Sequence, residues 1–538
     1  MKNKAKKIWG ILLASMMIVM SCMTVFAEGP APISNIPKSS DRATITVKNV
    51  EDGATVSWYK IVQANYGTNG EGLTGYSPVE GVVIANVEAP TASEITTIAA
   101  AINGGTLTSL ASGTLTRNES GNYTAEVEAG SYLVLVRGTG TTIYNPLVVS
   151  AGYGTEDSVL KDGEVDVNGS YTISGETAYA KSSEPDIKKT ITDEDAENEH
   201  GKSMAVGDQV GFKIETTLPD YSDEYADDKV TFEITDTLSK GLSYVSDTEG
   251  KTFTILVDGT ELTGDELTNS GITSLIEGQT ATINFPAAYV KANGGKAVVI
   301  TYKAELNDQA GINFDVNTNT ATLTYTHDPS GVTKTDSSKT YQYTFGIDAN
   351  LNGTSGTGTG KTHEIIKVGE NGKVEVIEKK DEIIDQINVT APLAGAEFTL
   401  TKDGKSITST TDENGYLSFT GLDIGTYELV ESKAPNGYSL DTTKHTVVIS
   451  AEFNEDGTLR QYSIAIDGKA TSTYEATYKS GSDEIEIIKS VEEVTTIKNT
   501  KVNNLPSTGG IGTYIFTILG VVLMGSAAAL FLRKSKRA

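Results

Sequence analysis

The segment Pro185-Asp186-Ile187-Lys188-Lys189-Thr190-Ile191 has the pattern of a β-strand with one face in a core. Successive side chains of a strand point to opposite faces. If Ile187 and Ile191 face the core, Lys189 faces it as well, whereas Lys188 faces water. A lysine is rarely buried without a partner. The segment therefore predicts a β-domain that holds a buried lysine, with its partner on another strand.

The same alternation recurs along the chain and predicts an all-β fold. Its clearest examples in this region are Val210 to Ile214, Val230 to Asp236 and Val298 to Leu306. Glycine, threonine, serine, asparagine and aspartate are abundant, which suits strands joined by turns. One helix is expected, because Thr91 and Glu94 have capping-box spacing. Its apolar stripe and its stop are formed by Ile95, Ile98, Ala99, Ile102 and Gly104.

Two further polar residues continue apolar faces in the region after Lys189. Asp236 follows Val230, Phe232 and Ile234 at alternate positions, and Asn319 precedes Ala321, Leu323 and Tyr325 in the same way. The set of Lys189, Asp236 and Asn319 resembles the self-crosslinking domains of Gram-positive pilins and adhesins. In that family a buried lysine amine attacks an asparagine amide, releases ammonia and leaves an isopeptide bond. The resemblance implies a Lys189–Asn319 crosslink that Asp236 promotes.

The chemistry of such a crosslink explains why all three groups are buried. Burial disfavours the charged amine, so the neutral, nucleophilic form of the lysine is populated. Burial also favours a protonated carboxyl group, which can polarise the amide carbonyl and carry protons. A bond from the first strand to one of the last closes a long loop and constrains the unfolded chain.

A later region carries a second set. The segments 392–400, 421–431 and 434–438, which include Tyr-x-Leu-x-Glu at 427–431, resemble the Cna B-type immunoglobulin-like fold. The resemblance implies that Glu431 is the promoting acid. Asn499 shares a face with Thr495 and Ile497 and is the acceptor candidate. Lys367 leads the domain on an alternating strand, but about 25 residues separate it from the segment at 392, so Lys379 is the rival lysine.

The C-terminus has three parts in a fixed order. Leu505-Pro506-Ser507-Thr508-Gly509 is followed by an almost uncharged run, Ile511 to Leu532, and a basic tail, 533–538. The run is long enough to cross a bilayer as a helix, with the tail on the cytoplasmic side. Together they resemble the cell-wall sorting signal of Gram-positive surface proteins. This implies a sortase that cuts between Thr508 and Gly509 and transfers Thr508 to an amine, and it makes peptidoglycan a partner.

The N-terminus reads as a secretory signal peptide. Residues 1–27 have a basic start, an apolar middle and an exit at Val25-Phe26-Ala27. The only cysteine of the chain, Cys22, lies inside this segment. A lipoprotein signal around Cys22 is an alternative, but Met20 fits it poorly and a lipid anchor would duplicate the C-terminal one. Without cysteine, the mature chain cannot use disulfides.

A lysine near the end of the first domain suits polymerisation. In pilins the lysine that attacks the thioacyl group of another subunit lies in a Tyr-Pro-Lys-Asn type motif, and Tyr179-Ala180-Lys181-Ser182 matches it at Tyr and Lys only. The order of segments resembles the major (backbone) subunit of sortase-assembled pili. The expected architecture is elongated, with tandem immunoglobulin-like (Cna B-type) β-sandwich domains. The expected boundaries are a signal peptide at 1–27, an N-terminal pilin domain at 28–181, an isopeptide-forming domain at 182–345, a Cna B-type domain at 346–502 and the sorting signal at 505–538.

Composition narrows the function further. The net charge is −28, and removal of the two terminal segments, which hold eight basic and no acidic residues, takes it to −36. This argues against nucleic acid as a partner and favours a self-repelling extracellular surface. The four histidines are scattered and no hydrolase motif is present, so a turnover enzyme is not expected. No cofactor or metal site is expected, although acidic loops such as 193–195 could hold calcium loosely.

Two points stay open at this level. Gly356-Thr357-Gly358-Thr359-Gly360-Lys361-Thr362 is close to a phosphate-binding loop, but a strand rather than a helix follows it, so a flexible connector is the better interpretation. The alternative to a pilus backbone subunit, which would assemble with other pilin subunits, is a monomeric wall-anchored adhesin or a minor pilin. Such an adhesin would bind a host surface ligand and would not need Lys181.

Overall fold

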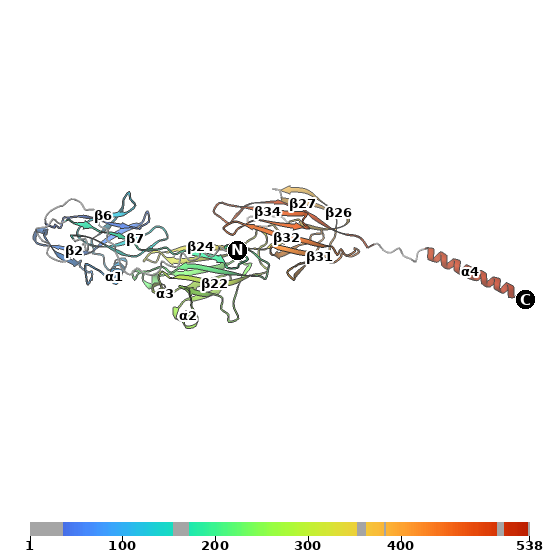
Figure 1. Cartoon of the computed structure of the whole chain (residues 1–538), viewed down its shortest axis with the longest axis horizontal. Coiled ribbons are helices and arrows are strands. Elements are labelled where there is room, and N and C mark those ends of the chain that lie inside the picture. Colours follow the sequence, from blue (N-terminus) through green and yellow to red (C-terminus); the bar gives the residue numbers. More distant parts are fainter. Residues whose placement is uncertain (1–35, 154–171, 352–361, 381–382, 503–510, 536–538) are drawn as a thin grey trace, which may run out of the picture.

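Three β-units follow one another along an elongated molecule (Figure 1). The computed structural model describes residues 36–153, 172–351, 362–380, 383–502 and 511–535. Each unit has its own buried apolar cluster, and strands dominate all three. The predicted all-β, elongated fold is confirmed. The helix α4 (Ile511–Ser535) lies at the far end of the molecule from the first unit.

The first unit packs two sheets around a core that includes Ile45, Val47 and Val134. The sheet orders are β11-β1-β6-β5 and β10-β9-β7-β2-β3, with β4 paired to β2. The predicted helix is confirmed as α1 (Ala92–Asn103), and both hydrogen bonds of its capping box between Thr91 and Glu94 are present. The strands are β1 (Ala43–Lys48), β2 (Thr55–Tyr66), β3 (Leu73–Pro78), β4 (Ser112–Thr114), β5 (Thr116–Arg117), β6 (Tyr123–Val127), β7 (Gly130–Arg137), β8 (Ile143–Tyr144), β9 (Leu147–Gly152), β10 (Ser174–Gly175) and β11 (Thr177–Tyr179).

The second unit is a sandwich of two six-stranded sheets. Their orders are β13-β15-β22-β18-β19, with β17 beside β22, and β14-β24-β23-β16-β21-β20. Two short helices, which the sequence analysis missed, are α2 (Gly264–Ser270) and α3 (Ala287–Ala292). The strands are β12 (Ser182–Ser183, which pairs with β8 of the first unit), β13 (Ile187–Ile191), β14 (Gly201–Ser203), β15 (Gln209–Thr217), β16 (Phe232–Leu238), β17 (Leu242–Val245), β18 (Thr254–Val257), β19 (Thr260–Glu261), β20 (Thr273–Glu277), β21 (Thr280–Asn284), β22 (Ala297–Leu306), β23 (Asn317–Thr326) and β24 (Thr333–Tyr343).

The third unit joins a seven-stranded sheet, β29-β28-β31-β32-β33-β34-β35, to a three-stranded sheet, β27-β26-β36. β26, near the start of this unit, and β36, its last strand, run parallel, with Lys367 opposite Ile497 and Gly369 opposite Asn499. The strands are β25 (Phe345–Ile347), β26 (Ile365–Lys380), β27 (Ile383–Pro392), β28 (Glu397–Lys402), β29 (Lys405–Thr410), β30 (Phe419–Leu422), β31 (Gly425–Lys433), β32 (Lys444–Phe453), β33 (Leu459–Ile466), β34 (Ala470–Tyr478), β35 (Ile485–Val491) and β36 (Thr495–Asn499).

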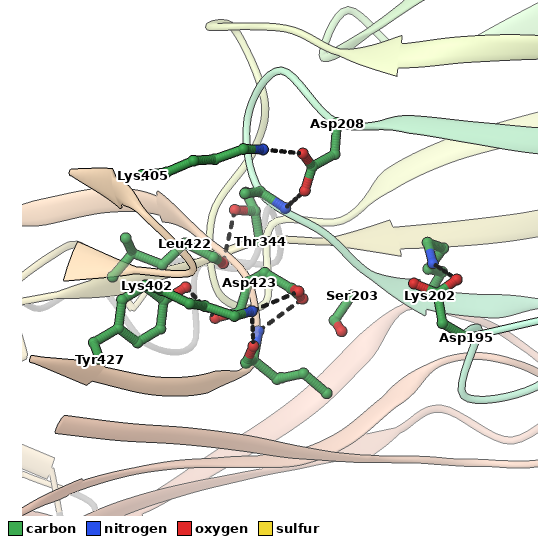
Figure 2. A network of polar contacts seen from close by, with 12 residues as sticks. Asp195, Lys202, Ser203, Asp208, Thr344, Lys402, Lys405, Leu422, Asp423 and Tyr427 are labelled. Carbon is green, nitrogen blue, oxygen red and sulfur yellow. Dashed lines mark hydrogen bonds and ion pairs between the residues drawn. The ribbon is translucent and has the colours of Figure 1, made fainter. Parts of the chain in front are cut away.

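Polar contacts fix the second unit against the third (Figure 2). The Val206 amide donates to the Gly421 carbonyl at 3.1 Å, and the Thr344 hydroxyl donates to the Leu422 carbonyl at 3.0 Å. Asp208 and Lys405 add an ion pair of 3.0 Å across the same junction. The junction therefore combines backbone hydrogen bonds, which set a fixed geometry, with a surface ion pair that adds little free energy.

Candidate functional site

Lys189 lies in the interior of the second unit, as its place in β13 predicts. Its side chain has no exposed surface, and its amine contacts a carboxylate oxygen of Asp236 and the hydroxyl of Tyr302. The amine also lies 5.0 Å from the ring centre of Phe212 and 4.9 Å from that of Tyr302. Desolvation lowers the pKa of the Lys189 amine, although Asp236 opposes this shift. The neutral form of the amine is therefore more populated here than it would be in water.

Asp236 and Asn319 come from neighbouring strands of the sheet that faces Lys189. In the β16–β23 register, Asp236 lies opposite Ala321 and Asn319 lies opposite Leu238. The Tyr302 hydroxyl links them, because it donates to Asp236 Oδ2 at 2.5 Å and accepts from Asn319 Nδ2 at 2.8 Å. The structure thus brings the three predicted residues into one buried network.

Tyr302 and Tyr244 belong to this network and were missed by the sequence analysis. Tyr244 donates to Asp236 Oδ2 at 3.0 Å, next to the bond from Tyr302. Burial, and secondarily the nearby Asp236, raises the pKa of Tyr302 well above its usual value, so its hydroxyl stays a donor. The period-2 pattern of β22 already placed Tyr302 on the inward face. Its proximity to Asp236 depends on the order of strands, which the pattern does not contain.

The amide oxygen of Asn319 is the unsatisfied atom of this site. It is buried and has no hydrogen-bond partner among the described residues. An unpaired acceptor in a dry interior costs free energy comparable to a lost hydrogen bond. A donor supplied by a protonated carboxyl group would satisfy this oxygen and polarise its carbonyl carbon.

The third unit repeats this arrangement with different strands. Lys367 on β26 is fully buried, with its amine 3.3 Å from Glu431 Oε1 and 5.1 Å from the ring centre of Phe398. The ion pair is close enough for attraction, but the amine makes no well-aligned hydrogen bond. Asn499 Nδ2 donates to both Glu431 oxygens, at 2.9 and 3.1 Å. Desolvation lowers the pKa of the Lys367 amine, with Glu431 opposing.

The two candidate lysines of the third unit have different surroundings. Lys367 is brought together with Glu431 and Asn499, whereas Lys379 is exposed near the far end of the same long strand. The residues between Lys367 and the segment at 392 form the β26–β27 hairpin. This hairpin accounts for the unusual spacing. The Asn499 oxygen, like that of Asn319, is buried and unpaired among the described residues.

Lys181 has the opposite environment from the two buried lysines. It lies between β11 and β12, where the first unit meets the second, and its side chain is 69% exposed. Its amine is 3.4 Å from Asp220, a partly exposed carboxylate. The amine is therefore accessible to a large partner in the monomer.

The terminal signals fall mostly outside the described residues. This holds for residues 1–27, for the motif from Leu505 through Thr508 to Gly509, and for 356–361 of the glycine-rich loop. The apolar run that follows the motif forms α4, and Tyr514–Arg533 within it is long and apolar enough to cross a membrane. The expected membrane-length helix is confirmed.

The acidic loop at 193–195 forms ion pairs with a lysine side chain of the same unit. Lys202, whose side chain is nearly buried, pairs with Asp195 at 2.5 Å and lies 3.6 Å from Asp193. Figure 2 shows the Lys202–Asp195 pair. Across the described ranges, no group of three or more His, Cys, Asp or Glu side chains is placed to hold a metal ion.

Comparisons with known proteins agree with this architecture. Family models match residues 40–182 (T6 antigen Ig-like domain), 377–461 (prealbumin-like fold domain) and 497–538 (LPXTG cell wall anchor motif). The trypsin-resistant surface T6 protein of Streptococcus pyogenes serotype M6 is 28% identical over 97% of this chain and 100% of its own length. Platelet adherence protein A of Streptococcus gordonii is 25% identical over 59% of this chain but only 8% of its own length.

A solved structure shares the fold. The T6 backbone pilin of serotype M6 Streptococcus pyogenes, which is described as a modular three-domain structure, superimposes with a TM-score of 0.59 and 23% identity, covering 86% of this chain and 99% of the pilin. Together with the anchor motif, these relationships make the chain a cell-wall-anchored surface protein that is similar to the T6 surface protein along nearly its whole length and shares the fold of the T6 backbone pilin.

Proposed function

We propose that this chain, a homologue of the T6 backbone pilin along nearly its whole length, is the backbone subunit of a covalently polymerised surface pilus. The observation that carries the proposal is the contrast among three lysines. Lys189 and Lys367 are buried beside an acid and an asparagine, whereas Lys181 is exposed at the junction between two units. The buried pair suits reactions inside the subunit, and the exposed lysine suits a reaction between subunits.

The proposed reaction between subunits is sortase-catalysed transpeptidation. The sortase cysteine attacks the carbonyl carbon of Thr508, the Thr508–Gly509 amide bond breaks, and the Gly509 amine leaves with α4 attached. The neutral Lys181 amine of the next subunit then attacks the thioester and releases the cysteine thiol. Sortase, the neighbouring pilin subunits and finally peptidoglycan are the partners in this scheme.

The proposed reaction inside the second unit needs no enzyme. The neutral Lys189 amine attacks the side-chain carbonyl carbon of Asn319, the bond from that carbon to Nδ2 breaks, and ammonia leaves. Asp236 carries the proton from the lysine nitrogen to the departing nitrogen. Lys367, Glu431 and Asn499 would follow the same course in the third unit. Each reaction happens once per molecule, so the subunit is a structural protein.

The polymer is tested by a denaturing gel of cell-wall extracts, probed for this protein, with Lys181→Ala beside the wild type. We expect a high-mass ladder in the wild type and a single species in the variant. Lys188→Ala is the matched control, because Lys188 is an exposed lysine on the nearby strand β13. This variant should keep the ladder. A single wall-linked band in the wild type would instead identify a monomeric adhesin.

The internal crosslinks are tested separately by the intact mass of the ectodomain, residues 28–504. Two crosslinks predict a mass that is two ammonias below the value calculated from the sequence. An undiminished mass would rule out both bonds and leave the polymer proposal untouched.

A further inference from the structure

An open groove on the first unit takes no part in either crosslinking reaction. It has a volume of about 610 Å³ and lies where β4 and β5 pass between the edges of the two sheets. The volume falls within the range of small-molecule sites in proteins. The residues that line it are Thr44, Trp58, Gly113, Thr114, Thr116, Thr124, Ala125 and Glu126.

The aromatic wall of this groove is held in a fixed position. The half-buried Trp58 packs edge-on against Tyr132, with ring centres 5.2 Å apart and an interplanar angle of 89°. Gly113 also lies against the indole, and an added Cβ there would come within 2.7 Å of the ring. Any larger residue at 113 would displace the ring. Because Gly113 has no side chain, the indole can pack directly against the backbone of β4. The groove therefore has a preformed aromatic surface.

The polar groups of the groove are mostly neutral. Four threonine hydroxyls and one carboxylate line it, and none of its lining residues is a lysine, arginine or histidine. The Thr44 hydroxyl donates to the Glu126 carboxylate, which orients that acceptor. A groove of this composition, on a chain with a net charge of −28, does not attract an anion. It offers donors and acceptors to an uncharged, hydroxyl-rich ligand.

We propose that this groove binds a neutral saccharide. A pyranose has one face of C–H groups, which packs on the electron-rich face of an indole, and a rim of hydroxyl groups that pair with threonines and a carboxylate. The proposal goes beyond the pilus function, which needs no such site. It gives each subunit a binding site on the unit that lies farthest from α4 (Figure 1). Repetition of the site along a polymer would raise the overall affinity through multivalency.

The sequence supplies a specific probe for this test. The chain has two tryptophans, and Trp9 lies in the segment expected to be removed as a signal peptide, so Trp58 is the single tryptophan of the ectodomain 28–504. Tryptophan fluorescence therefore reports on the groove alone. We would titrate the ectodomain with lactose, chitotriose and maltotriose to about 20 mM, which covers the weak affinities usual for single small ligands, and follow it by a neutral-glycan array.

The expected result is a saturable fluorescence change with at least one saccharide. Glu126→Gln, which keeps the tryptophan and the size of the side chain, should weaken that binding by about tenfold or more, because it removes a charged acceptor. Glu80→Gln, an exposed acid of the same unit outside the groove, is the matched control and should bind like the wild type. Trp58→Phe, followed by saturation-transfer NMR, should also lose affinity.

Three outcomes would overturn the proposal. They are a flat titration together with a blank array, equal binding by Glu126→Gln and the wild type, or a groove that binds extended threonine-rich peptides instead of saccharides. The ladder assay with Lys181→Ala is independent of all three, so failure here and failure of the pilus proposal are distinguishable.

Discussion

At the scale of single residues, we expect the acid next to each buried lysine to decide whether a crosslink forms. Asp236 and Glu431 are the groups placed to carry a proton from the amine to the leaving nitrogen. We expect Asp236→Ala and Glu431→Ala each to remove one of the two ammonia deficits from the intact mass of the ectodomain, after correction for the substitution. Lys379→Ala, an exposed lysine, should keep both deficits. A full deficit in Asp236→Ala would show that the bond forms without this acid.

The environment of Lys189 also predicts a pH-dependent stability in a variant that cannot crosslink. Burial lowers the pKa of the folded amine below the unfolded value of about 10.4, so between the two values the unfolded chain binds one more proton. The free energy of unfolding then rises with pH in that window, by up to about 1.4 kcal/mol per pH unit. Stability is therefore lowest below the folded pKa and is recovered as the pH approaches the unfolded value.

This prediction is measured by scanning calorimetry of the second unit from about pH 7 to about pH 10, a range that approaches the unfolded lysine pKa. We expect the stability of Asn319→Ala to rise with pH more steeply than that of the double variant Lys189→Met/Asn319→Ala. The double variant lacks the amine but keeps every other titrating group. Parallel curves for the two variants would mean that the buried amine stays charged in the folded unit.

At the scale of elements, the parallel pair β26 and β36 brings a strand near the start of the third unit together with its last strand. A Lys367–Asn499 bond would close a loop of more than a hundred residues and would stabilise the folded unit by about 5 kcal/mol in the chain-entropy model. We expect Asn499→Ala to lower the unfolding temperature of this unit by about 10–20 °C. Lys498→Ala, an exposed neighbour on β36, should change it little. An unchanged temperature in Asn499→Ala would contradict a stabilising crosslink.

The sequence predicted those parts of the fold and site that depend on local periodicity. Alternation along β13, β16 and β23 correctly predicted that Lys189, Asp236 and Asn319 face inward, and the capping box predicted α1. Tyr302 lies on a strand with an equally clear alternation of side chains. Its contact with Asp236 could not be predicted, because alternation along one strand does not say which strands are neighbours.

Two other features lay beyond the reach of sequence patterns. The choice between Lys367 and Lys379 stayed open, because Lys367 had the strand pattern but an unusual spacing, and only the folded hairpin separates their environments. Helices α2 and α3 were missed because they are short and carry almost no buried stripe. The crosslinks themselves remain predictions, because burial and proximity favour the bond without forming it.

At the scale of the whole molecule, the second and third units are held in register by a tight backbone contact. Gly421 has a φ of 77°, and a Cβ there would come within 2.9 Å of the Val206 side chain. We expect Gly421→Ala to loosen this junction and broaden the distance distribution in small-angle X-ray scattering. Gly437→Ala is the matched control, since it has a φ of 84° but open space around its Cβ. Equal scattering profiles for the two variants would show that this contact does not set the angle.

The placement of the crosslinks has a mechanical consequence for the polymer. If the proposed linkage forms, tension on a shaft would enter each subunit at Lys181 and leave at Thr508. With both bonds formed, the covalent route between these points runs through residues 181–189, crosses to 319–367, and crosses again to 499–508. The β-strands enclosed by the two crosslinks lie outside this load path, so a pulling force would be borne by covalent bonds and could not unravel them.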